Sequence, residues 1–236
     1  GFYEEIQRQK QENYNTAMAE GSYAFDSRKY AEAIRQYNIA LANKPGDEAA
    51  TQRLAESQQM ENMRVSALAN EYNSYVTKGD AQLQTKNYDK AIEFYTKAVQ
   101  LNTDNPYAAN KIREIGEILK ANKLVELTPV AVTINANETK RFEFQPVDVT
   151  TRRGNYILIK AKNLVEKPFI MYISYGNRDG EHGGFMVSVP NNQEVNDFIV
   201  RIGSQYKWFS EDNTWIEVMP EGGSIEISTM EITKGN

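Results

Sequence analysis

The residues best suited to ligand chemistry are aromatic and acidic side chains near the C-terminal end of the sequence. The pattern predicts a hairpin in which strands 205–209 and 214–218 are joined by a four-residue polar loop. Alternation along both strands then places four side chains on one face, those of Tyr206, Trp208, Trp215 and Glu217. Aromatic rings that stack on sugar rings, beside a carboxylate that accepts hydrogen bonds from hydroxyls, form a carbohydrate-binding platform.

The same hairpin permits a second interpretation. A shift of one residue in the strand register would turn Trp208 and Trp215 into the core, where large aromatic side chains usually lie. The two interpretations differ in the exposure of the indole rings, because a sugar platform requires them to face solvent.

The glycine-rich loop 176–184 carries oxygen ligands at alternate positions. Asn177, Asp179 and Glu181 have the spacing of a calcium loop. However, Arg178 lies among them and no glutamate follows to complete the site as a bidentate ligand. The pattern favours a surface loop, and we predict no metal site.

The sequence does not predict an enzyme. His182 is the only histidine, and it lacks a nucleophile or an orienting partner nearby in the sequence. Glu211 and Asp212 could act as a hydrolase carboxylate pair, but they lie at a hairpin tip that requires polar residues. The chain has no cysteine and no glycine-rich phosphate loop. We therefore predict no catalytic residues and no cofactor.

Charge and hydropathy exclude two further classes of function. The 236 residues contain 27 basic and 32 acidic side chains, a net charge of −5, and neither half of the chain is cationic. The chain therefore lacks the positively charged surface that nucleic-acid binding requires. Apolar runs extend over only a few residues, far short of the roughly 20 that a membrane span requires.

The elements that must position these side chains fall into two halves. Residues 1–121 contain 18 of the 21 alanines and show helical periodicity. Residues 122–236 show short alternating runs separated by Gly, Pro, Asn and Asp. We predict an all-α domain over 1–121 and an all-β domain over 122–236. About nine short strands indicate a two-sheet sandwich of jelly-roll type. A parity change after Ile227 predicts a β-bulge near Ser228 and Thr229.

The helical half contains an internal repeat at an offset of 58 residues. The shared positions are Gly21, Tyr30, Ala33, Tyr37 and Ala40 in the first copy, and Gly79, Tyr88, Ala91, Tyr95 and Ala98 in the second. Small residues allow two helices to approach closely, while the tyrosines fill the space between them. The pattern predicts two helical hairpins, linked by a long helix that begins near residue 47 and closed by a helix over 104–121.

This pattern resembles the tetratricopeptide repeat over about residues 12–121. The family has a 34-residue period, so the offset of 58 is a departure. Tyr75 and Lys78 stand where the family has its bulky first-helix positions, which predicts atypical packing of that helix. The resemblance implies a concave groove for a partner's peptide or helix. The groove positions are Asn15, Met18, Ser22, Asp26, Asn73, Val76, Asp80 and Gln84. None is basic, and the alternative is a spacer whose groove is merely solvated.

Residues 125–235 loosely resemble galactose-binding-like and carbohydrate-binding-module sandwiches, which implies sugar or protein binding. We expect a non-enzymatic adaptor that binds a protein through its repeats and a polysaccharide through its sandwich. The alternatives are a structural scaffold of a cell-envelope assembly, in which both domains make only protein contacts, and a carbohydrate-active enzyme. The absence of cysteine fits an exported bacterial protein, either periplasmic or on the cell surface, whose leader or anchor lies outside this sequence.

Overall fold

The computed structural model describes residues 1–148, 154–178, 180, 182–202, 208 and 213–235. It divides into two compact units, Gly1–Ser74 and Tyr75–Asn236. The division falls within helix α3 (Glu48–Gln84), so compactness groups the second repeat with the sandwich. Helices give way to strands between Lys120 and Lys123. The predicted domain division at residues 121 and 122 stays a prediction.

The first unit contains helix α1 (Phe2–Asp26), helix α2 (Tyr30–Asn43) and the first part of α3. Its core consists largely of alanine and tyrosine. The Tyr37 ring is fully buried and lies so close to Gly21 that a Cβ there would be 2.6 Å from it. The predicted close approach of the two helices is therefore confirmed.

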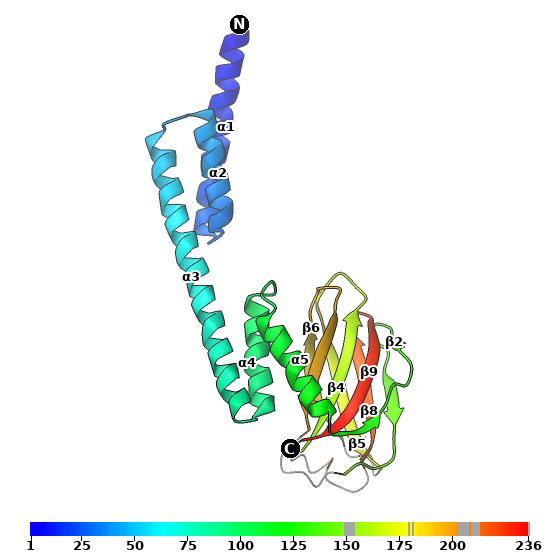
Figure 1. The fold of residues 1–236 in the computed structure, drawn as a ribbon. Coiled ribbons are helices and arrows are strands. Elements are labelled where there is room, and N and C mark those ends of the chain that lie inside the picture. The colour runs from blue at the N-terminus through cyan, green and yellow to red at the C-terminus, as the bar shows by residue number, and fades with distance from the viewer. Residues whose placement is uncertain (149–153, 179, 181, 203–207, 209–212, 236) are drawn as a thin grey trace. The chain divides into compact units, whose positions relative to one another are not determined.

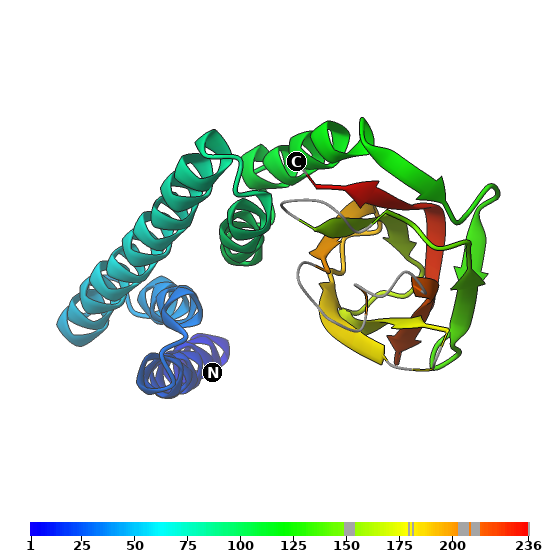
Figure 2. The same cartoon turned by 90° about the horizontal axis from the view of Figure 1, so that it is seen from below.

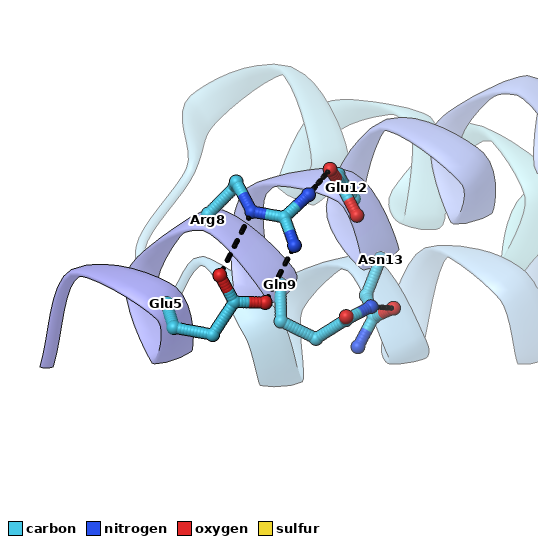
Figure 3. Close-up of polar contacts among 5 residues, drawn as sticks. All are labelled: Glu5, Arg8, Gln9, Glu12 and Asn13. Atoms are coloured by element: carbon cyan, nitrogen blue, oxygen red, sulfur yellow. Dashed lines mark hydrogen bonds and ion pairs between the residues drawn. The ribbon is translucent and has the colours of Figure 1, made fainter. Parts of the chain in front are cut away.

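Helix α1 extends beyond its tertiary contacts, because residues 1–13 are all exposed. Polar contacts along the helix support it there (Figure 3). The Arg8 side chain donates a hydrogen bond to Glu5 through Nε at 3.1 Å and another to Glu12 through Nη1, while the Gln9 amide donates to Asn13 at 3.0 Å. Such pairs each stabilise a helix by a few tenths of a kcal/mol, about 0.2–0.5 kcal/mol.

The second unit begins with the remainder of α3, followed by α4 (Tyr88–Leu101) and α5 (Tyr107–Lys120). Gly79 repeats the arrangement of the first copy, since a Cβ there would lie 2.6 Å from the Tyr95 ring. Tyr75 and Lys78, the positions for which atypical packing is predicted, both lie against α4. Tyr75 stacks on Phe94 with ring centroids 6.5 Å apart, and the Lys78 ammonium lies over both rings.

Strands of the second unit form two antiparallel sheets (Figures 1 and 2). One sheet has the order β1-β9-β4-β7, with β2 also paired to β9, and the other has the order β3-β8-β5-β6. Their bounds are β1 (Lys123–Glu126), β2 (Val132–Ile134), β3 (Lys140–Glu143), β4 (Asn155–Asn163), β5 (Phe169–Asn177), β6 (His182–Val189), β7 (Val195–Arg201), β8 (Asn213–Glu221) and β9 (Ile225–Lys234). Helical repeats followed by a β-sandwich are thus confirmed. The predicted bulge is also confirmed, because Lys160 pairs with Thr229 while the adjacent Ala161 pairs with Ile227.

Among the described residues, the main helix–sheet contacts of the second unit involve one of its two sheets. Helix α5 contacts β4, β7 and β9, and the Gly116 position faces Ile199 at 3.5 Å. Ion pairs surround this contact, with Arg113 3.5 Å and Lys160 3.0 Å from the Asp197 carboxylate. Among the helices that the structure describes, none is long and apolar enough to cross a membrane. Within the described part of the chain, these helix contacts leave the outer face of the β3-β8-β5-β6 sheet uncovered by helices of its own unit.

Candidate functional site

Trp208 lies in the core of the sandwich. Its side chain is 0% exposed, and its indole Nε1 donates a hydrogen bond to Asn155 Oδ1 at 2.8 Å. The ring meets Tyr175 edge-on at a centroid distance of 5.7 Å and Phe144 at 5.9 Å. The platform prediction is wrong for this residue, because both the apolar ring and its N–H find partners between the sheets. Tyr206 lies outside the described residues.

Trp215 and Glu217 occupy the outer face of the helix-free sheet. They alternate along β8 with Ile216 and Val218, which are fully buried in the core. Trp215 lies opposite Glu143 on β3 and opposite Gly176 on β5. The two side chains therefore share the outer face, as predicted, but the Trp215 indole is buried and does not form the predicted solvent-facing platform.

An arginine covers the Trp215 ring. The Arg141 guanidinium carbon lies 4.2 Å from the ring centroid, and its Nε donates to Glu217 Oε1 at 2.8 Å. On its other side, the Trp215 Nε1 donates to the backbone carbonyl of Asn177 at 3.1 Å. Trp215 is consequently only 8% exposed. The three side chains of Arg141, Trp215 and Glu217 form one polar–aromatic cluster across β3 and β8.

This cluster borders a shallow depression of about 610 Å³ on the sheet surface. Its lining includes Glu143, Ser174 and Thr214 together with the three side chains of the cluster. Ser174 lies opposite both Glu217 and Gly184, and the glycine keeps the surface low at that point. The depression thus combines guanidinium donors, carboxylate acceptors and hydroxyls, which can recognise a polyhydroxylated ligand.

Arg141, Glu143 and Ser174 were not predicted as site residues. Their alternation in the sequence marks them as outward-facing, but nothing local shows that β3 and β5 flank β8. Asp179 and Glu181 of the predicted loop lie outside the described residues. Among the described residues, no cluster of His, Asp and Glu side chains could hold a metal ion.

The predicted groove residues of the first repeat differ in accessibility. Asn15 and Asp26 are exposed, and the Gln11 amide donates a hydrogen bond to Asn15 at 2.9 Å. Met18 is half-buried and packs against the alanine-rich core, and Ser22 is also half-buried. These side chains leave a largely polar helix face, on which partner binding stays a prediction.

In the second repeat, one groove residue has a structural role. Asp80 accepts hydrogen bonds from the hydroxyls of Tyr95 at 2.6 Å and Tyr107 at 3.1 Å, which ties α3 to α4 and α5. Burial in the first place, and the Asp80 carboxylate in the second, raise the pKa of the Tyr95 hydroxyl. The exposed Asn73 and Gln84 and the half-buried Val76 complete the predicted set.

Known structures offer only distant likenesses. An agarase, AgWH50C, has a TM-score of 0.35 at 13% identity over 48% of this chain and 22% of its own. The Family 16 Carbohydrate Binding Module-2 has a TM-score of 0.30 at 9% identity over 44% and 76%, respectively. AlgX of Pseudomonas aeruginosa has a TM-score of 0.30 at 11% identity over 55% and 31%. Because all three TM-scores lie below 0.5, we infer function from the residues of the site alone.

No curated protein matches the chain in sequence. Residues 72–105 match the tetratricopeptide repeat family. The matched segment begins at Tyr72 on α3 and includes all of α4, and it contains the contact of Gly79 with Tyr95. The second helical copy is therefore a tetratricopeptide repeat, a unit that implies protein interaction.

Proposed function

We propose that the protein is a non-enzymatic adaptor whose sandwich binds a neutral polysaccharide and whose helical repeats bind a protein. The observation that carries the proposal is the polar–aromatic cluster on a sheet face that no helix of its own unit covers. A sheet face that presents guanidinium, carboxylate and hydroxyl groups beside one another suits a hydroxyl-rich ligand.

The charges of the cluster favour a neutral ligand. Arg141 and Glu217 already neutralise each other at 2.8 Å, and Glu143 and Arg178 add one further charge of each sign, so the described side chains that line the depression carry no net charge. An anionic polysaccharide would have to approach these carboxylates, whereas neutral hydroxyls can donate to them and accept from the guanidinium. A sugar ring lying across the pair would meet both groups at once.

Gel electrophoresis through polysaccharide-containing gels tests this proposal with the full chain. Retardation by at least one neutral polysaccharide is expected, and it should be lost in the Arg141→Ala, Glu217→Ala double variant. A matched control replaces Glu166 and Lys167, an exposed acidic and basic residue of the β4–β5 connection, with alanine. The proposal fails if no polysaccharide retards the chain or if both double variants behave alike.

A hydrolase is the second candidate, because Glu143 and Glu217 line the same depression. Two carboxylates beside a glycosidic bond are the usual catalytic pair of glycosidases. Prolonged incubation with any retained polysaccharide separates the candidates. Binding without new reducing ends supports the adaptor, whereas release of reducing ends that Glu143→Gln abolishes supports the enzyme.

The protein-binding part of the proposal concerns the repeats. Support comes from the match at residues 72–105 and from exposed polar side chains on α1 and α3. A scaffold in a cell-envelope assembly would use the same repeats with protein contacts alone. An exported location belongs to the proposal as well, because polysaccharides of the envelope would be accessible there.

A further inference from the structure

The outer face of the β3-β8-β5-β6 sheet continues beyond the cluster into a second, apolar region. Strand register places Tyr172 of β5 opposite Met219 of β8 on one side and opposite Met186 of β6 on the other. All three share the outward parity of Trp215, Glu217 and Ser174 on their strands. They form a row across the sheet, which we call the methionine–tyrosine row.

This row is accessible and partly fixed. Met186 is 73% exposed, among the largest values for any apolar side chain of the sandwich, while Tyr172 and Met219 are half-buried. The Tyr172 hydroxyl donates a hydrogen bond to Glu221 Oε2 at 3.1 Å, which holds the ring over the sheet. A half-buried tyrosine ring flanked by two flexible thioethers offers an adaptable apolar surface.

The distance from the cluster follows from strand geometry. Tyr172 lies two residues from Ser174 and four from Gly176, the partner of Trp215, along β5. At about 3.4 Å per residue, the row lies about 7 Å from Ser174, which lines the depression, and about 14 Å from Trp215. Gly184 and Ser174 occupy the interval, so no large outward side chain of β5 or β6 separates the two regions.

We propose that the sandwich binds an internal stretch of a linear polysaccharide that runs along β5 and β8, with the methionine–tyrosine row as its second contact region. This inference rests on the proposed function and names its ligand class. A single sugar ring on the Arg141–Glu217 pair would leave the row empty, because Met219 lies two residues, about 7 Å, from Glu217 along β8. An extended chain contacts both regions and gains affinity from each.

Length dependence tests the inference with the full chain. Saccharides of one to eight units, prepared from the polysaccharide that retards the chain most strongly, are titrated by calorimetry. Affinity is expected to rise roughly 3- to 10-fold once the oligosaccharide is long enough to reach Tyr172, and then to level off. Tyr172→Ala should remove that gain while leaving the affinity for the shortest binding oligosaccharide unchanged.

Controls separate recognition from folding. Tyr172→Phe keeps the ring but loses the hydrogen bond to Glu221, and it should retain most of the gain. Thermal melts show whether each variant is folded. Equal affinity of short and long oligosaccharides, or an unchanged gain in Tyr172→Ala, overturns the inference and leaves the proposed function intact. Failure of every polysaccharide to bind overturns both.

Discussion

Replacement of Trp208 by alanine is expected to destabilise the sandwich severely. The ring is 0% exposed and packs against Tyr175 and Phe144, so its loss opens a large cavity. Tryptophan-to-alanine changes in cores cost about 3–5 kcal/mol. The variant also leaves the buried Asn155 Oδ1 without its donor, which adds a penalty of about 1–3 kcal/mol. We expect a total loss of about 5 kcal/mol in the free energy of unfolding.

Urea denaturation of the full chain measures this loss. With a slope of about 2 kcal/mol per molar urea, the midpoint of the sandwich transition should fall by roughly 2.5 M. Trp215→Ala is the matched control, because its ring lies on the outer face under Arg141. We expect it to cost only about 1–2 kcal/mol, since water and the arginine can fill the space. Equal midpoints for the two variants would refute the assignment of Trp208 to the core.

The helices carry three further predictions. Gly79→Ala should lower the free energy of unfolding by about 1–3 kcal/mol, because a Cβ would lie 2.6 Å from the Tyr95 ring. Thermal melts should show no such loss for the control Gly116→Ala, where the nearest atom to a Cβ is 3.5 Å away. Burial raises the pKa of Tyr95 in the folded protein above its unfolded value of about 10. The stabilisation of the helical hairpin by the neutral hydroxyl is therefore fully present below pH of about 10 and is lost as the pH rises further, which a titration followed by circular dichroism measures. The hydrogen bond from Lys44 is the largest cause that lowers the pKa of Asp47 to about 2. The contribution of the ionised Asp47 carboxylate to the free energy of unfolding should therefore be present above pH of about 4 and disappear as the pH falls towards 2. Asp47→Asn should remove this pH dependence from the acid titration.

The fold could be predicted where local patterns and small residues determine the packing. Gly79 and Tyr95 lie 16 positions apart in the repeat, and the structure brings them together as the pattern indicated. The bulge at Ser228 follows equally from parity alone. Strand β1 is hard to recognise from the sequence, because its four residues alternate only weakly and pair with β9, more than 100 positions away.

The site could be predicted only in part, because it depends on which strands become neighbours. Trp215 and Glu217 were placed on one face from alternation within a single strand. Arg141 reaches them from β3, and its position over the indole depends on a pairing across 76 positions of sequence. For Trp208 the alternative interpretation, a position in the core, is confirmed. The sequence does not reveal that the buried Asn155 accepts a hydrogen bond from its N–H.

Oxidative footprinting of the full chain, with and without the bound polysaccharide, tests the central claim most directly. Hydroxyl radicals modify exposed methionine and aromatic side chains, and mass spectrometry locates them. We predict strong protection of Met186 and Tyr172 on the sandwich, with unchanged modification of Met63 on α3, which is 59% exposed. Protection of Met63 with no change at Met186 would contradict the assignment of the ligand to this sheet face.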